Sequence, residues 1–297
     1  MSFYISVVIP LYNKEQSIYK TVSSVIDQTF GDFELLVVDD GSTDKSLEIV
    51  KSIDDSRIKI ICQNNSGVSS ARNTGIINSK GKYVFLLDAD DEITTDCFQI
   101  FHDLTIKYNG IMVFVSNFGI KSKADSIVPY CLEKSEKSIS SPLKYLWLGK
   151  VFPRTGTLLI NRDCFTQVGF FNSDISLFED LEFIIRLLRK YTIVFTPRIL
   201  MLYVAEFNSL SQKILPLHKE LAFYSEFTNK SFYERMILAE NIYLSYLLRK
   251  KNNDVESCSI LVEKYKKFFF LFLFAIIIRK LRKEFNRLND KFHDLFN

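Results

Sequence analysis

The chain has 297 residues, 47% of them hydrophobic and 25% charged, which is enough to bury one large core or a core with an appendage. Its net charge is +3. Residues 250–297 contain 11 Lys/Arg and 6 Asp/Glu and so carry +5, which leaves a net charge of −2 on the rest of the chain. A basic tail on a slightly acidic body is not the profile of a nucleic-acid-binding protein, so we expect no nucleic acid as a partner. Five scattered cysteines without a C-x-x-C spacing and only three histidines argue against a disulfide framework, a zinc site and a His-rich metal site.

Strand and helix patterns alternate through the first hundred residues. Continuous apolar runs predict strands, and apolar residues spaced three and four apart predict helices. The runs follow one another at 6–10 (strand), 17–28 (helix), 33–38 (strand), 42–53 (helix), 58–62 (strand), 69–78 (helix) and 83–87 (strand). This alternation predicts an α/β fold with a Rossmann-like, mostly parallel central sheet and helices on both faces.

The rest of the chain is less regular and then becomes helical. Strands are predicted at 111–117, 157–161 and 192–195, and an amphipathic helix at 179–190. Beyond about residue 214 the pattern is wholly helical, so we place a domain boundary near Gln212. We expect a first domain of residues 1–212, with halves at 1–104 and 105–212, and a C-terminal helical appendage of residues 213–297.

Polar clusters follow three of the predicted strands. They are Tyr12-Asn13, residues 39–42 and the acidic turn Asp88-Ala89-Asp90-Asp91. In open α/β sheets, ligands bind beyond the carboxyl ends of the strands. We therefore expect the three clusters to converge on one edge of the sheet.

The acidic turn has two interpretations. Hard divalent cations such as Mg²⁺ or Mn²⁺ take oxygen ligands and often link carboxylates to phosphate oxygens. A solvated acidic loop is about as good an interpretation of the four residues alone. The apolar strand before them favours the metal site, because it fixes Asp88 at the ligand-binding edge.

Two further polar segments also allow both a functional and a structural role. Asp40 can accept a hydrogen bond from a nucleotide base or ribose, or it can help to cap the next helix, and Gly41 allows a tight turn. Arg72 lies in the Gly- and Asn-rich segment 65–75. It can pair with Asp40, face a nucleotide, or be an ordinary surface arginine.

Glu179 and Asp180 begin the predicted helix 179–190. Acidic residues at a helix start are commonly only capping devices. A carboxylate beside a bound hydroxyl group can instead act as a general base. The spacing alone does not decide between these roles.

Six segments form an ordered set: Val7–Asn13, Val37–Asp44, Asn65–Gly75, Leu87–Asp91, Gly169–Asn172 and Glu179–Asp180. This set resembles the family 2 glycosyltransferases, in particular bacterial polysaccharide-biosynthesis enzymes, over about residues 3–211. One such motif is weak evidence, whereas the set in the right order and spacing is strong evidence. The resemblance implies the GT-A fold and inversion of configuration at the transferred sugar.

The resemblance also implies an activity. The protein would be a metal-dependent glycosyltransferase of the hexosyltransferase class, which moves a sugar from a nucleotide-sugar, by resemblance a UDP-sugar. The acceptor would be a hydroxyl group of a glycan or lipid-linked glycan, in cell-surface polysaccharide synthesis. Residues 1–104 would be the nucleotide-binding half of the catalytic domain and residues 105–212 its acceptor-side half.

The family's site residues can be carried over one by one. By role they are nucleotide-binding Pro10, Tyr12, Asp40, Arg72 and Asp88, metal-binding Asp90 and Glu206, and the catalytic base Asp180. Asp88 and Asp90 form the D-x-D pair, with Asp88 toward the ribose and Asp90 on Mn²⁺ or Mg²⁺. Glu206 departs from the family, which usually has a His at this position that helps to hold the metal or diphosphate. A carboxylate also ligates a hard cation.

The two ends of the chain bear on its location. The first six residues lack the basic and apolar stretches of a signal peptide, so we expect a cytoplasmic protein. Near the other end, the apolar run Phe268–Ile278 lies between basic flanks, which predicts an interfacial helix over 264–283 on the inner face of the cytoplasmic membrane. The alternative is a helix that packs on protein.

The chain lacks the motifs that two alternative functions would require. A sugar nucleotidyltransferase would normally have a Gly-rich phosphate loop after the first strand, and a dinucleotide-dependent oxidoreductase would have G-x-G-x-x-G there. Residues 10–14 (Pro-Leu-Tyr-Asn-Lys) contain no glycine. A non-catalytic nucleotide-sugar-binding protein stays open as an alternative.

Overall fold

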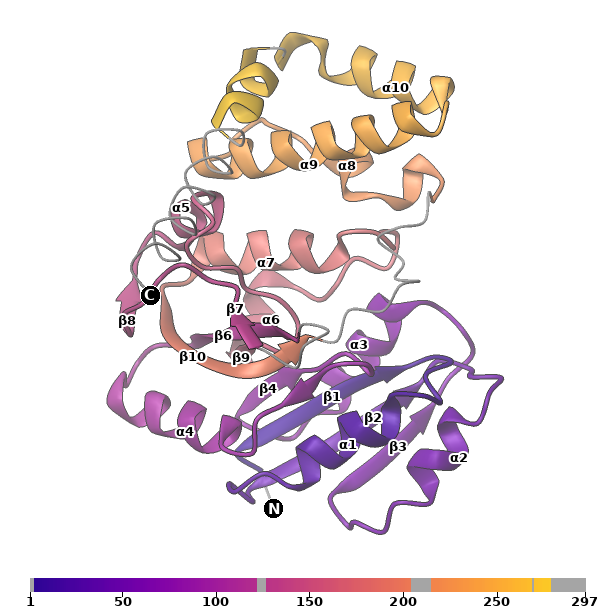
Figure 1. Ribbon diagram of the computed structural model, residues 1–297, viewed down its shortest axis with the longest axis vertical. Coiled ribbons are helices and arrows are strands. Elements are labelled where there is room, and N and C mark those ends of the chain that lie inside the picture. Colours follow the sequence, from indigo (N-terminus) through magenta and orange to yellow (C-terminus); the bar gives the residue numbers. More distant parts are fainter. Residues whose placement is uncertain (1–2, 122–126, 204–214, 269, 279–297) are drawn as a thin grey trace.

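The computed structural model describes residues 3–121, 127–203, 215–268 and 270–278. The described strands form one large sheet, and helices cover both of its faces (Figure 1). The helices that follow residue 215 form a further layer at the end of the molecule away from β1–β3, and α7 (Glu179–Lys190) lies between the sheet and this layer (Figure 1).

The first half of the sheet is built as the sequence predicts. Its elements are β1 (Ile5–Leu11), α1 (Ile18–Ile26), β2 (Phe33–Asp39), α2 (Ser46–Lys51), β3 (Ile58–Cys62), α3 (Val68–Asn78) and β4 (Tyr83–Leu86). The strands lie in the order β3-β2-β1-β4, and each neighbouring pair is parallel. β1 and β2 are buried at every position, as expected of parallel strands covered on both faces.

The second half of the sheet is mixed. Its elements are β5 (Glu92–Ile93), α4 (Cys97–Lys107), β6 (Val113–Lys121), β7 (Ile127–Pro129), β8 (Lys137–Ile139), α5 (Pro142–Trp147), β9 (Leu158–Asn161), α6 (Asp163–Val168), α7 and β10 (Ile193–Tyr203). β9 is inserted between β4 and β6 and runs antiparallel to both. β6 and β10 are parallel, and β5 pairs antiparallel with β10. The expected parallel order therefore holds from β3 to β4, and antiparallel pairs enter beyond β4.

The C-terminal part is helical, as predicted. Its elements are η2 (Leu217–Lys219), α8 (Leu221–Tyr224), α9 (Phe232–Lys251), α10 (Val255–Tyr265) and η3 (Lys266–Phe268), followed by helical residues 270–278. The predicted boundary near Gln212 lies outside the described residues. None of the helices in the described ranges combines the length and the apolar character needed to cross a membrane.

Two hydrophobic cores lie on the two faces of the sheet. Successive residues of a strand point to opposite faces, so Val7 and Ile9 join one core and Val8 joins the other. The Val7 core is closed by α1 and α4. The Val8 core runs on through α6 and α7 to α9 and α10, so the C-terminal helices share a core with the sheet.

Helix α3 lies unusually close to β1. A Cβ atom on Gly75 would lie 2.2 Å from Cγ1 of Val8, so only glycine allows this approach. The contact matters for the site, because α3 carries Arg72.

Candidate active site

The acidic turn follows β4 at the carboxyl edge of the parallel strands. Leu87 donates its N–H to Val8 O at 3.0 Å, which continues the pairing with β1. Ser17 Oγ donates to Ala89 O at 2.9 Å, so the start of α1 holds the turn from the other side. The structure thus brings the turn next to the loop after β1, as the sequence predicts.

Asp88 is bound at both carboxylate oxygens. Arg72 Nη2 donates to Oδ1 at 2.7 Å, and Thr155 Oγ1 donates to Oδ2 at 2.7 Å. Burial acts to raise the pKa of Asp88, but the charges of Arg72 and Arg154 hold it below its usual value. Asp88 is therefore a fixed carboxylate of the site.

The other two carboxylates of the turn also lie beside cationic side chains. Lys14 Nζ is 2.5 Å from Asp90 Oδ2, and Arg154 Nη2 is 3.4 Å from Asp91 Oδ2. Asp91 is buried, whereas Asp90 is partly exposed. The turn therefore presents Asp90 to solvent at the edge of the sheet.

Arg72 joins the two halves of the site. Its guanidinium group is buried and donates to Asp88 and, through Nη1, to Glu179 Oε1 at 2.9 Å. Its charge also lies over the ring of Phe171, 5.2 Å from the centroid. Of the alternatives open from the sequence, Arg72 neither pairs with Asp40 nor lies on the surface.

Glu179 is the second carboxylate on Arg72. Burial raises its pKa to about 7, the charge of Arg72 opposes the rise, and the charge of Asp180 adds to it. A single guanidinium group therefore serves two partly buried carboxylates, one just after β4 and one at the start of α7.

Asp180 lies in the first turn of α7, where its Oδ1 accepts the N–H of Leu181 at 2.7 Å. The helix begins abruptly because Phe178 has a left-handed backbone with φ 63°. Asp180 is half-buried and adjoins Glu179, so the structure places it beside the Arg72 pair. This bond to the next residue is not a side-chain cap of the helix start, and it leaves the second carboxylate oxygen of Asp180 for a further role.

Asp40 organises the loop that leads into α3. Its Oδ1 accepts from Gln63 Nε2 at 2.7 Å and from Ser66 N at 2.9 Å, and its Oδ2 accepts from Gly67 N at 2.8 Å. Gly41 has φ 76°, the turn expected of a glycine at this position. Asp40 is thus buried at the predicted edge, with its donors supplied by the protein itself.

The end of β1 carries one exposed aromatic side chain. Pro10 is buried within the strand, whereas Tyr12 is 47% exposed. Asn13 has φ 50°, and its side-chain oxygen accepts Thr43 N at 2.8 Å, which ties this loop to the loop after β2. Tyr12 is therefore the residue of this motif that is open to a ligand.

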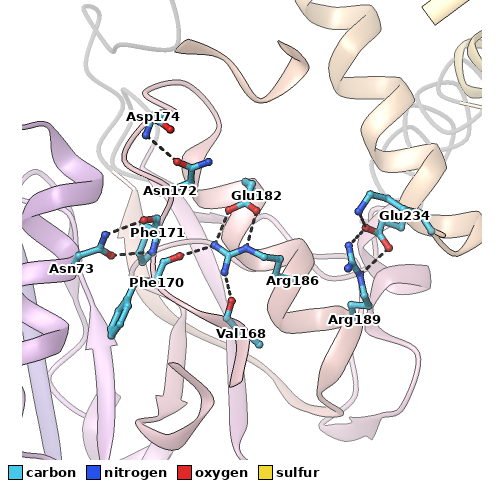
Figure 2. Close-up of polar contacts among 11 residues, drawn as sticks. Asn73, Val168, Phe170, Phe171, Asn172, Asp174, Glu182, Arg186, Arg189 and Glu234 are labelled. Atoms are coloured by element: carbon cyan, nitrogen blue, oxygen red, sulfur yellow. Dashed lines mark hydrogen bonds and ion pairs between the residues drawn. The ribbon is translucent and has the colours of Figure 1, made fainter. Parts of the chain in front are cut away.

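The segment after Gly169 is clamped between α3 and α7 (Figure 2). Asn73 and the backbone of Phe171 exchange two hydrogen bonds of 2.9 Å. Arg186 donates to the carbonyl groups of Val168 and Phe170, and its other partner is Glu182 (Figure 2). This brings the predicted acceptor-side segment to the same side of the sheet as Asp88.

A polar groove of about 350 Å³ runs between α7 and the C-terminal helices. Its lining includes Asn172, Glu182, Arg186, Arg189, Tyr224 and Glu234. Arg189 pairs with the buried Glu234 across the groove (Figure 2). The charged groups of its lining therefore also tie α7 to α9.

The donor set of the turn suits a hard cation that arrives with a phosphate. Mg²⁺ is commonly bound through one or two carboxylates together with substrate phosphates. Asp90 offers such a carboxylate, since Asp88 is held at both oxygens. Within the described ranges no group of three metal-ligating side chains is preformed, and the other predicted ligand, Glu206, lies outside them.

Three site residues were not predicted from the sequence. Lys14, Arg154 and Thr155 reach the acidic turn through contacts that join distant parts of the chain. Lys14 is a neighbour of the predicted motif Tyr12-Asn13, which was an available signal, and Glu179 was a motif residue whose pairing with Arg72 was not predicted. Arg154 and Thr155 lie in an irregular stretch before β9, where no pattern marks them.

Residues 6–171 of the chain match the family described as "Glycosyl transferase family 2". The chain belongs to this family. Its relatives include glycosyltransferase GlyA of Streptococcus pneumoniae serotype 4, 43% identical over 106 residues, which are 35% of this chain and 15% of GlyA. The uncharacterized glycosyltransferase EpsJ of Bacillus subtilis is 31% identical over 186 residues, 60% of this chain and 54% of EpsJ. The chain thus spans little more than half of EpsJ and a small part of GlyA.

Solved structures of S. aureus TarS share the fold. The complex of TarS 1–349 with UDP-GlcNAc superposes with a TM-score of 0.65 at 18% identity, over 80% of this chain and 66% of that chain. The likeness shows a GT-A fold, with the central sheet and helices described above. The fold class and the family predicted from the sequence are both confirmed.

Proposed function

We propose that the protein is an inverting glycosyltransferase that moves a sugar from a UDP-sugar to a hydroxyl group of a glycan or lipid-linked glycan. The observation that carries the proposal is the Arg72 bridge, which sets the acidic turn and the start of α7 side by side. In a single displacement the acceptor oxygen attacks the sugar of the bound donor directly, so the donor site and the base that activates the acceptor must lie close together. The UDP-GlcNAc bound by the structural neighbour TarS supports a UDP-sugar as donor.

On the donor side, the strand ends supply the binding groups. Tyr12 is exposed beside the end of β1 and borders the nucleotide, with Pro10 shaping the strand end. Asp40 fixes the loop that faces the base, and Asp88, held by Arg72, points toward the ribose. Asp90, with Glu206 as the second predicted ligand, would hold Mn²⁺ or Mg²⁺. The metal, when bound, neutralises charge that develops on the departing diphosphate.

On the acceptor side, Asp180 acts as the general base. Its carboxylate removes the proton of the acceptor hydroxyl group while the oxygen attacks the anomeric carbon, opposite the leaving nucleoside diphosphate. One new glycosidic bond forms, the bond to the diphosphate breaks, and configuration inverts. The neighbouring Arg72–Glu179 pair keeps the start of α7 in place during this step.

The Asp180→Asn substitution tests the reaction. A panel of UDP-sugars with Mn²⁺ should contain a donor that raises the melting temperature and releases UDP. In Asp180→Asn we expect the same thermal stabilisation, but UDP release slower by about 10²–10⁴-fold, the usual contribution of a general base.

Asp163→Asn is the matched control, because Asp163 is exposed in the first turn of α6. It should release UDP at the wild-type rate. Full activity in Asp180→Asn would sink the assignment of the base. Donor binding by the wild-type protein without UDP release under any condition would favour the non-catalytic binding protein instead.

We also propose that the protein is cytoplasmic and touches the inner face of the membrane through residues 264–283. Among the described residues of this stretch, Phe270 is 84% exposed and Ile277 is 53% exposed. An apolar groove of about 370 Å³ lies between α9, α10 and residues 270–278, and its lining includes Phe272, Leu273 and Ile276. Exposed apolar side chains next to lysines, such as Lys266 and Lys267, are typical of helices that bind anionic interfaces.

Liposome flotation checks this contact. The wild-type protein should float with vesicles that contain phosphatidylglycerol and much less with pure phosphatidylcholine. Phe270→Ser combined with Ile277→Ser should abolish flotation, because it removes the apolar anchor. Ile106→Ser, at a site on α4 whose exposure (63%) lies between those of Phe270 and Ile277, should leave flotation unchanged. Flotation of the double variant at the wild-type level would contradict the proposal.

A further inference from the structure

Two exposed aromatic side chains form a corner on the surface, and none of the predicted motifs contains them. Tyr130 is 44% exposed and Phe152 is 37% exposed, and their rings meet at 60° with centroids 5.3 Å apart. Tyr130 also stacks on the buried Phe118, with centroids 4.5 Å apart and 20° between the planes. One face of the Tyr130 ring is therefore covered by the core, and its exposed surface lies on the other side and along the rim.

The aromatic corner lies at the same edge of the sheet as the acidic turn. Phe118 belongs to β6, which runs in the same direction as β4 because β9 lies between them and is antiparallel to both. Phe152 lies in the stretch before β9, whose amino end meets this edge. Arg154 lies over the ring of Phe118 at 5.4 Å and pairs with Asp91 at 3.4 Å. Only Phe118 and Arg154 thus separate Tyr130 from the acidic turn.

The strand order places the aromatic corner on one side of the turn and the proposed nucleotide site on the other. The neighbouring strands run β2-β1-β4-β9-β6. Tyr12 and Asp40 follow β1 and β2, whereas the corner lies at the end of β6. A ligand at the corner therefore reaches the acidic turn from the side away from the nucleotide.

Hydrogen bonds fix the backbone around the corner. The side-chain oxygen of the buried Asn117 accepts Cys131 N at 2.8 Å, and its Nδ2 donates to Cys131 O at 3.3 Å. Glu133 N donates to Lys150 O at 3.0 Å, which ties the stretch that carries the tyrosine to the stretch that carries the phenylalanine. An aromatic surface that is already held in place loses little conformational entropy when a ligand binds.

A sugar ring has the chemistry to occupy this corner. The C–H groups on the face of a pyranose carry a slight positive charge, so they pack on the negative face of an aromatic ring while the hydroxyl groups stay in water. Single exposed apolar side chains are common on protein surfaces, but a backed and clustered pair at a ligand-binding edge points to an interaction site. Two rings that meet at an angle can contact one sugar from two sides.

We propose that Tyr130 and Phe152 form the subsite that holds a pyranose ring of the acceptor glycan. The inference rests on the proposed function, because it needs an acceptor that is a sugar. Tyr130 supplies the stacking face and Phe152 the side wall. The two residues position the acceptor and take no part in proton transfer, so their loss should affect sugar binding and leave the affinity for UDP unchanged.

Saturation-transfer NMR measures sugar binding on the protein saturated with UDP and Mn²⁺, with a panel of methyl pyranosides as probes. The wild-type protein should bind at least one of them, with the strongest transfer to C–H protons of one face. Tyr130→Ser and Phe152→Ser should each weaken this binding by up to about ten-fold, whereas Tyr130→Phe keeps the ring and should retain it. Tyr19→Ser, the loss of a 59% exposed tyrosine on α1, is the control and should match the wild type.

Calorimetry of UDP binding separates the inference from the proposed function. Weaker pyranoside binding in both serine variants at unchanged UDP affinity supports both. Pyranoside binding at the wild-type level in both serine variants, or no pyranoside bound by the wild type, would overturn the subsite and leave the donor site in place. A loss of UDP affinity in the serine variants would show a structural role instead. Pyranoside binding at the corner of a protein that binds no UDP would overturn the acceptor role together with the proposed function. Circular dichroism spectra establish that each variant is folded.

Discussion

At the scale of single residues, the site depends on one buried guanidinium group shared by two carboxylates. Arg72 binds Asp88 at the end of β4 and Glu179 at the start of α7. The motif containing Arg72 and the acidic turn could be predicted from the sequence, because each is a local pattern at a strand end or helix start. The pairing with Glu179 could not, since the two residues are 107 positions apart and only the fold brings them together.

Glu179 should make stability depend on pH. Its pKa is raised from 4.5 to about 7 in the folded state, mainly by burial. The folded protein therefore binds more protons than the unfolded chain between these pH values, and the stability falls as pH rises from about 4.5 to 7, by up to about 3 kcal/mol. Glu179→Gln removes the titrating group. We expect its free energy of unfolding, relative to the wild type, to rise over this range.

Urea unfolding at pH 4.5, 6 and 7.5 measures this difference. At pH 4.5 Glu179 is protonated in the folded state, and there the two proteins should differ least. A difference that stays constant from pH 4.5 to 7.5 would show that Glu179 does not titrate in this window.

At the scale of elements, local patterns predicted the first half of the sheet well. The strand 58–62 and the helix 179–190 have the predicted bounds, because a buried run and an amphipathic repeat end where polar or turn residues begin. Helix α4 was not predicted, although Phe98, Phe101 and Leu104 have helical spacing and face the core. The antiparallel insertion of β9 follows from distant pairing, which no local pattern encodes.

The contact of α3 with β1 gives a prediction at this scale. Gly75→Ala should lower the free energy of unfolding by about 1–3 kcal/mol, because the new methyl group would overlap the stiff, buried side chain of Val8. Val8→Ala in the same chain opens the space again, so the double variant should be more stable than the sum of the two single changes predicts. Additive losses in urea titrations of the three variants would show that α3 moves away instead.

At the scale of the whole molecule, the C-terminal helices are tied to the sheet by charge as well as by the shared core. Arg249 of α9 and Glu220 form an ion pair of 2.5 Å with both side chains buried. Leu177, just before α7, pairs with Glu220 in a short parallel bridge. The second oxygen of Glu220 accepts from Ser245. These contacts favour one cooperative unit, whereas the sequence pattern alone predicts a catalytic domain and a separate extension.

The single tryptophan of the chain allows the two arrangements to be distinguished. Trp147, at the end of α5, packs against Phe232 of α9 at a ring distance of 5.8 Å, so its emission reports on the junction. Far-UV circular dichroism reports on all helices and strands. In a cooperative unit both signals change at the same urea concentration.

Removing the buried charge of Arg249 should shift the urea midpoints of both signals by the same amount. Arg249→Met leaves the Glu220 carboxylate buried without its partner, a change that typically costs about 3–5 kcal/mol. We expect the tryptophan and circular dichroism midpoints to fall by the same amount, whereas Lys251→Met, an exposed change in the last turn of α9, should leave them in place. If the tryptophan signal alone moved to lower urea, the helices would unfold before the sheet. The extension predicted from the sequence would then be an independent unit, and the shared core would not be enough to couple it to the catalytic domain.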